Sequence, residues 1–368
     1  MMWNTLSGKP TGRVPVAPFI FSNIVNEYNG GEPQDPIAAG IALYRRFGFD
    51  ILLRNYIISD YLDESFVSCA NWHVQKQVER KGEDWDEKTV VNTPERQLTQ
   101  VKSFRRISQF EVVEAVTEYY IKEQEDFTQF KKYQPSLPQY DCAIITHAKE
   151  LIGQDGLTGP WVQGAFNMAG MYRELSELLT DPYVDEAFYA DMMEYFGERV
   201  TGFMKQAIRA GADFISMSGN MASGSMAGPK MFAEYVMPYE KRVINAVHKE
   251  GAKIIYHNCG DAKLLLPLYA QMGIDMYESL TAAPYGDTVL EEALRAIPLP
   301  TALSGGIDQI SFLKTASPDD VHRRVKQVLD TVKPRGGFVL AASDYICEGT
   351  PEENLIALAK AGLEFGAY

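Results

Sequence analysis

Residues 253–260 read Lys-Ile-Ile-Tyr-His-Asn-Cys-Gly, and this stretch decides how the rest of the chain is interpreted. The run 253–256 follows helix-like sequence and Gly251, a pattern typical of a buried parallel strand. Side chains alternate faces along a strand, so His257 and Cys259 are expected to point the same way from its C-terminal end. One imidazole and one thiol on the same face make half of a tetrahedral zinc site. The stretch therefore predicts a zinc enzyme.

Strand-like and helix-like segments alternate on both sides of this stretch. The predicted strands are 13–21, 49–54, 156–162, 213–217, 253–256, 274–278, 300–303 and 337–342. The predicted helices include 36–47, 229–250, 262–272, 289–296, 317–332 and 352–365. Repeated strand–helix units of this length imply a parallel sheet with right-handed crossovers. Eight such units would close a TIM (β/α)8 barrel, and a chain of 368 residues lies within the range of that fold with insertions.

Residues 71–135 are expected to be an insertion of hairpins and a helix within a single barrel domain that spans 1–368. The Gly82-Glu83-Asp84 turn and the β-branched residues Thr89-Val90-Val91 favour antiparallel hairpins over 71–106. The segment 111–132 has a helix-like pattern.

The composition is typical of a soluble globular protein, with 46% hydrophobic and 23% charged residues. The net charge of -14 argues against a general surface for nucleic acids or anionic membranes. No segment resembles a signal peptide or reaches membrane-spanning length. The four cysteines are scattered, so they are expected to be thiols or ligands rather than disulfides, with Cys69 and Cys142 structural. These features favour a cytoplasmic location.

The catalytic residues of a TIM barrel gather at the C-terminal ends of its strands. His257 and Cys259 together with Cys347, which follows the last strand, would give zinc three protein ligands and an open fourth position. Glu278, Asp308 and Asp344 stay as alternative ligands, orienting groups or substrate contacts. The predicted substrate-binding residues on this rim are Gln163, Asn167, Ser218, Asn220, Glu278, Asp308 and Asp344.

A purely structural interpretation of the same residues is also available. A single cysteine in a strand is usually a small buried hydrophobe, and a single histidine is usually a satisfied core residue. Carboxylates that follow strands often serve as N-caps of the next helix. The i, i+2 pair at a strand end favours metal binding over this interpretation, whereas Cys347 depends on a loop distance that the sequence leaves open.

At these residues the chain resembles the uroporphyrinogen decarboxylase superfamily, and within it the cobalamin-dependent methyltransferases related to methylcobamide:coenzyme M methyltransferase. The resemblance covers nearly the whole chain and implies a TIM barrel. The motifs that carry it are Gly159-Pro160, Gly211-Ala212-Asp213, Pro238-Tyr239, His257-Asn258-Cys259-Gly260, Gly305-Gly306-Ile307-Asp308 and Gly349-Thr350-Pro351-Glu352-Glu353-Asn354.

Two chemistries occur in the superfamily, and the motifs favour one of them. The decarboxylases carry an arginine-rich N-terminal signature, Arg-Gln-Ala-Gly-Arg, where this chain reads Phe19-Ile20-Phe21-Ser22-Asn23. The methyltransferase branch uses His-x-Cys and a distant cysteine as zinc ligands, which His257 and Cys259 match directly. The family's third ligand falls near Asp344, with Cys347 three residues later, so either residue is a candidate.

The resemblance implies a zinc-dependent methyltransferase that exchanges methyl groups with a corrinoid (cobalamin) on a separate carrier protein. Its small-molecule partner would be either a thiol acceptor or an O- or N-methyl donor. The alternatives are a decarboxylase of a carboxylated substrate and a barrel that binds a corrinoid or small ligand without catalysis. The identity of the donor or acceptor, the direction of transfer and the oligomeric state lie beyond the sequence.

Overall fold

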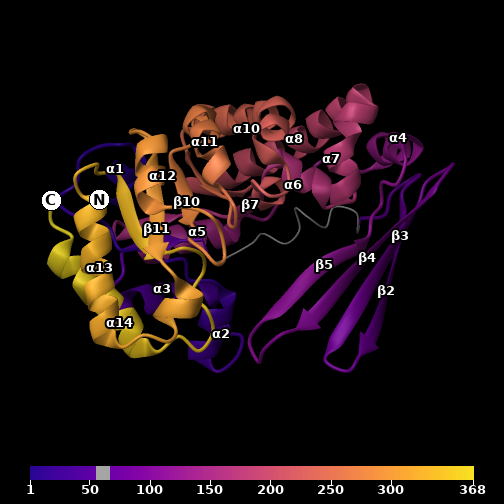
Figure 1. Cartoon of the computed structure of the whole chain (residues 1–368). Helices are drawn as coiled ribbons and strands as arrows, with labels where there is room; N and C mark the ends of the chain where they lie inside the picture. The colour runs from indigo at the N-terminus through magenta and orange to yellow at the C-terminus, as the bar shows by residue number, and fades with distance from the viewer. Residues whose placement is uncertain (55–66) are drawn as a thin grey trace.

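The computed structural model describes residues 1–54 and 67–368, and its centre is a barrel of parallel strands (Figure 1). In chain order the barrel strands are β1 (Ile51–Leu53), β6 (Gly156–Thr158), β7 (Trp161–Gln163), β8 (Phe214–Ser218), β9 (Lys253–His257), β10 (Met276–Leu280), β11 (Ala302–Ile307) and β12 (Phe338–Ala342). Parallel strands end at the same rim, and His257 lies level with Ser218 of β8 and Glu278 of β10. The barrel thus gathers strand-end residues on one face.

Residues 156–163 act as one bent strand, because β6 pairs with β1 and β7 pairs with β8. At the bend, Gly159 N donates to Leu53 O at 3.1 Å and Ser216 N donates to Pro160 O at 3.0 Å. A Cβ on Gly159 would lie 1.9 Å from the carbonyl oxygen of Phe214. Only glycine allows this close approach, so the Gly-Pro pair is what lets one strand bridge two neighbours.

The segment 13–21, predicted as the first strand, closes the barrel but forms few regular strand-to-strand hydrogen bonds. Leu340 N donates to Pro15 O and Asp50 N donates to Val16 O, both at 2.8 Å. Pairing is limited to a bridge at Val16 because Pro15 and Pro18 have no N–H to donate. With this segment, the described part of the chain has eight strand positions around the barrel, which confirms the predicted (β/α)8 fold.

The helices wrap the outside of the barrel strands, as Figure 1 shows. Ser317 caps α13 by accepting from Asp320 N, as its position before Pro318 predicts. The bounds of the helices are α1 (Met2–Leu6), α2 (Ser22–Asn29), α3 (Pro36–Phe47), α4 (Gln124–Tyr133), α5 (Ala143–Ile152), α6 (Ala165–Gly170), α7 (Leu175–Val184), α8 (Glu186–Arg209), α9 (Gly228–Met231), α10 (Met237–Lys249), α11 (Leu266–Met272), α12 (Leu290–Ala296), α13 (Pro318–Val332) and α14 (Glu352–Phe365). Among the described residues, no helix is both long and apolar enough to cross a membrane.

An antiparallel sheet stands beside the barrel, at the right of Figure 1. It consists of β2 (His73–Lys81), β3 (Asp84–Asn92), β4 (Gln97–Arg106) and β5 (Val112–Glu118), paired in that order. The hairpins predicted over 71–106 are confirmed. The helix predicted from residue 111 is wrong at its start, because the β-branched residues of 112–117 pair with β4, and helix begins only at Gln124. The insertion bounds 71–135 and the single-domain reading stay predictions.

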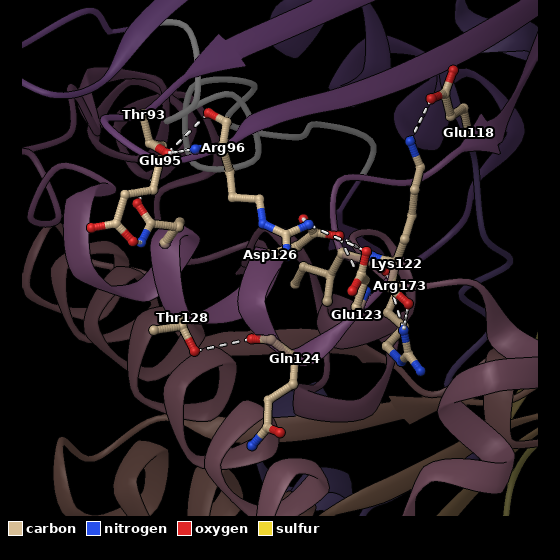
Figure 2. Close-up of polar contacts among 12 residues, drawn as sticks. Thr93, Glu95, Arg96, Glu118, Lys122, Glu123, Gln124, Asp126, Thr128 and Arg173 are labelled. Carbon is tan, nitrogen blue, oxygen red and sulfur yellow. Dashed lines mark hydrogen bonds and ion pairs between the residues drawn. The ribbon is translucent and has the colours of Figure 1, made fainter.

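One end of this sheet is tied to α4, as Figure 2 shows. Arg96, in the turn between β3 and β4, lies 3.2 Å from Glu123 and 3.5 Å from Asp126. Glu123 and Asp126 also form a reciprocal capping box at the start of α4. Arg173 donates to the carbonyl of Lys122 at 3.0 Å, which links the same segment to the barrel side. These contacts position the inserted sheet at its β3–β4 end.

Candidate metal centre

The rim of the barrel brings together one imidazole, one thiol and one carboxylate. His257 ends β9 and is 3% exposed, and Cys259 follows it two residues later in a half-buried position. Asp344 comes from the loop after β12. One potential ligand atom from each of the three residues lies within 4.8 Å of the other two. The structure therefore brings both side chains of the predicted pair together, although β9 ends at His257 and Cys259 lies in the loop beyond it.

Two neighbours on β10 fix the orientation of the His257 ring. Its Nδ1 donates to Glu278 Oε1 at 3.1 Å and also lies 3.1 Å from the hydroxyl oxygen of Ser279. Its Nε2 lies 3.8 Å from Asp344 Oδ1. Because Nδ1 is engaged, Nε2, which lies toward Asp344, is the nitrogen available to a metal ion.

A buried arginine completes this line of contacts. Arg54, directly after β1, forms an ion pair with Glu278 Oε2, and both side chains are almost fully buried. The Arg54 guanidinium carbon lies 4.4 Å from the centre of the Phe19 ring, so the cation is also held over an aromatic face. Arg54 is not among the site residues predicted from the sequence, although a charged residue at the end of an apolar strand is a signal that could have identified it.

The electrostatics of the centre favour positive charge. Burial works against a charge on His257, but Asp344, Cys259 and Glu278 outweigh it and raise the pKa of His257 to about 10. Burial also disfavours the Glu278 carboxylate, but Arg54 and His257 outweigh that effect and lower the pKa of Glu278. The group of acceptors around Nε2 therefore attracts a cation, whether a proton or a metal ion.

Aromatic side chains form one wall of the centre. The Trp161 ring centre lies 4.8 Å from that of His257, and Phe19 stacks on Trp161 at 5.3 Å. Tyr345 is next to Asp344 in the chain, and its ring centre lies 6.5 Å from that of Phe19 in an edge-to-face arrangement. These rings are not among the residues predicted from the sequence, because aromatic residues at strand ends are most often part of the core.

Cys347 is not part of the group formed by His257, Cys259 and Asp344. Its carbonyl accepts from the backbone N–H and the hydroxyl of Thr350, at 3.2 and 2.7 Å, in the turn before α14. Burial raises the pKa of the Cys347 thiol, and Asp344 contributes in the same direction. The structure thus brings the carboxylate, rather than the second thiol, to the histidine–cysteine pair.

Four of the predicted substrate-binding residues form one polar cluster. Asn167 of α6 is fully buried, and its Nδ2 lies 2.7 to 3.2 Å from acceptors on Gln163, Ser218 and Asn220. Its Oδ1 accepts from Met221 N at 3.1 Å. Ser218 pairs with His257 across adjacent strands, so the cluster lies on the same rim as the candidate metal centre.

Asp308 has a local structural duty. Its Oδ1 accepts from Ile310 N at 2.8 Å and from Ser311 N at 2.9 Å, which caps the π-helical turn η6 (Gln309–Leu313). It also lines a cavity of about 660 Å³ with Ser343 and residues of α13. The two glycines before it lie within β11 rather than after it, since Gly305 and Gly306 pair with Leu340 and Ala341.

The donor set of this centre fits zinc. Zinc binds imidazole nitrogen, thiolate sulfur and carboxylate oxygen, and catalytic sites keep three protein ligands with one open position. His257, Cys259 and Asp344 offer one donor of each kind at a strand-end rim. Such a centre can act as a Lewis acid on a substrate that fills the fourth position.

Comparison with known proteins agrees with this architecture. A family model described as Uroporphyrinogen decarboxylase (URO-D) matches residues 110–365. The chain is 25% identical over 205 residues to the methylated-thiol–coenzyme M methyltransferase of Methanosarcina mazei, a match that spans 56% of this chain and only 51% of that protein. It is 22% identical to a methylcobamide:CoM methyltransferase of Methanosarcina acetivorans, covering 66% of this chain and 68% of the relative.

The chain also matches decarboxylases. The uroporphyrinogen decarboxylase of Geobacter sp. (strain M21) is 26% identical over 235 residues, covering 61% of this chain and 65% of that protein. Among solved structures, a methyltransferase from Methanosarcina mazei superposes with a TM-score of 0.73 at 17% identity, covering 99% of this chain and 97% of the other. At that identity the superposition shows the shared fold alone.

Proposed function

The chain belongs to the uroporphyrinogen decarboxylase family, and from that premise we propose that it is a zinc-dependent methyltransferase that works with a corrinoid protein. The observation that carries the proposal is the group of His257, Cys259 and Asp344 at the barrel rim. Such a set of metal donors suits Lewis-acid methyl transfer. Two of the matched relatives are named as methyltransferases, which supports the same choice.

The proposed ligands are His257 through Nε2, Cys259 through its sulfur and Asp344 through a carboxylate oxygen. Asp344 takes the third position in place of Cys347, because its oxygen lies within the group and the Cys347 sulfur does not. When bound there, zinc would polarise the heteroatom of a methyl donor or lower the pKa of an acceptor thiol. A carboxylate donates less electron density to the metal than a thiolate does, so the metal stays a stronger Lewis acid. This favours the first role, in which zinc polarises a methyl donor.

The surrounding residues have separate tasks in this proposal. Glu278 and Ser279 hold the His257 ring through Nδ1 and leave Nε2 directed at the open site. The cluster around Asn167 offers amide and hydroxyl groups on the same rim to orient the small-molecule substrate. The corrinoid of a carrier protein would approach this rim to supply or receive the methyl group.

A decarboxylase is the second enzyme candidate, because decarboxylases occur among the relatives. That activity needs free cations to bind substrate carboxylates. Arg54, the buried arginine described at the centre, is already paired with Glu278, and the N-terminal stretch 19–23 carries no arginine. These observations favour methyl transfer over decarboxylation.

Metal analysis of the purified protein is the direct test. About one zinc per chain is expected, and His257→Ala should lose it while His322→Ala, which removes an exposed histidine paired with Glu364, should keep it. Mixing the zinc-loaded protein with cob(I)alamin and candidate methyl donors, or with methylcobalamin and candidate thiols, should change the cobalt absorption spectrum. A protein without zinc, or one indifferent to His257→Ala, contradicts the proposal and leaves a decarboxylase or a non-catalytic binding barrel.

A further inference from the structure

A continuous line of charged contacts leads from β1 to the candidate metal centre. Arg54 pairs with one oxygen of Glu278, and the other oxygen of Glu278 accepts from His257 Nδ1 at 3.1 Å. Arg54 is 1% exposed, and Glu278 is 4% exposed. The carboxylate is thus shared between a permanent cation and the imidazole, with little access to water.

We propose that Arg54 is a positioning residue that keeps Glu278 out of the metal coordination sphere. By holding the carboxylate on the Nδ1 side of His257, Arg54 makes Glu278 an orienting group and leaves the fourth metal position open to substrate. This inference rests on the proposed function, because it assumes that the centre binds a metal ion.

The need for such a residue follows from where Glu278 lies. It is the direct cross-strand neighbour of His257 on β10, and carboxylates are ordinary zinc ligands. Without a competing cation, a buried carboxylate on the strand next to His257 would be attracted to a divalent metal ion and would fill its open position. Arg54 supplies the competing positive charge at the same depth in the barrel.

Arg54 is also held in place by aromatic contacts, so it can compete with the metal ion for Glu278. Its guanidinium lies over the Phe19 ring at 4.4 Å, and Phe19 in turn stacks on Trp161 at 5.3 Å. Its planar guanidinium binds carboxylates with strong directional preference. The arginine therefore gives Glu278 a fixed alternative to the metal.

X-ray absorption at the zinc edge, which counts oxygen, nitrogen and sulfur ligands, tests the inference without an activity assay. Arg54→Met should add one oxygen ligand, because Glu278 turns to the metal, and the double variant Arg54→Met/Glu278→Gln should lose that oxygen again. Arg54→Lys, which keeps the charge, should restore the wild-type count. Substitution with Co²⁺ and its visible spectrum should show the same order.

Arg13→Met is a matched control, because Arg13 forms an ion pair with Asp50 at 2.8 Å before β1, at the opposite end of that strand from Arg54. The number of oxygen, nitrogen and sulfur ligands around zinc should be the same in Arg13→Met as in the wild type. An unchanged ligand count in folded Arg54→Met overturns the inference. Wild-type protein that binds neither zinc nor Co²⁺ overturns the proposed function instead.

Glu278→Gln alone keeps the question answerable if Arg54→Met does not fold. An orienting Glu278 predicts an unchanged ligand count in this variant and zinc affinity lower by roughly 10- to 100-fold. A Glu278 that already ligates the metal predicts the loss of one oxygen ligand, and that result overturns the inference.

Discussion

The Tyr345 hydroxyl donates to Glu111 Oε1 at 2.7 Å, although 234 positions separate the two residues in the chain. Glu111 lies in the turn between β4 and β5, and Tyr345 directly follows Asp344. A second contact joins the Ser108 hydroxyl of the same turn to Glu348. The inserted sheet therefore holds the loop that carries the proposed third ligand, at the end opposite to its attachment on α4.

Tyr345→Phe tests this support, because it removes the hydroxyl and keeps the ring that packs near Phe19. One lost hydrogen bond is worth about 0.5–1.5 kcal/mol, so zinc affinity should fall by up to roughly tenfold. Competition with a chelator measures this change. Tyr285→Phe, which removes the contact of an exposed hydroxyl with Ser311 at 2.8 Å, is the control and should leave zinc affinity unchanged. Equal affinities for both variants would mean that the sheet does not position Asp344.

Paired substitutions on one loop decide the third ligand. Asp344→Asn should lower zinc content, since a neutral amide binds zinc far more weakly than a carboxylate, whereas Cys347→Ser should retain it. Metal analysis after dialysis against a weak chelator gives the result. The reverse outcome would assign the site to Cys347 and would require the loop after β12 to shift when metal binds.

The buried carboxyl group of Glu240 predicts a pH dependence of stability. Burial raises its pKa to about 7, although Ala165 N and Phe166 N at the start of α6 donate to it. A carboxyl group whose pKa is higher in the folded state binds its proton more tightly there, so stability falls as the pH rises from about 4.5 to 7. The loss attributable to Glu240 is on the order of 3 kcal/mol.

Glu240→Gln should flatten that part of the profile, because a neutral side chain has no charge to bury. Denaturant unfolding at pH 5 and pH 8 measures the effect as the difference between the two free energies of unfolding. Glu234→Gln, at an exposed position of the same helical stretch, should follow the wild-type profile. A Glu240→Gln profile as steep as the wild type would show that other groups cause the dependence.

Asn167→Ala tests the polar cluster on the rim. The substitution removes the amide that joins Gln163, Ser218 and Asn220, so methyl transfer should slow at least tenfold while zinc content stays at the wild-type level. Asn354→Ala is the comparison variant, since Asn354 is equally buried and donates to the backbone carbonyls of Leu313 and Ala316 instead of to the cluster. A similar loss of activity in both variants would reduce the role of Asn167 to stability.

Much of the barrel was predictable because its signals are local. Apolar runs followed by helical patterns located the strands from β8 to β12, and the start of α13 was predicted to within one residue, with Ser317 as its N-cap. The first strand was harder to assign, since Pro15 and Pro18 leave it without a regular ladder. The segment 112–118 was misread as helix because its partner strand, not its own pattern, decides its conformation.

The meeting of His257 and Cys259 was predictable from the sequence itself, because residues two apart in an extended chain point the same way. This held although the strand ends at His257 and Cys259 lies just beyond it. Which other groups meet that pair was decided only by the tertiary structure. Asp344 rather than Cys347 reaches the pair through the course of a loop, and Arg54 reaches Glu278 across the barrel interior. Contacts of this kind depend on how distant segments pack, and no local pattern of residues encodes those distances.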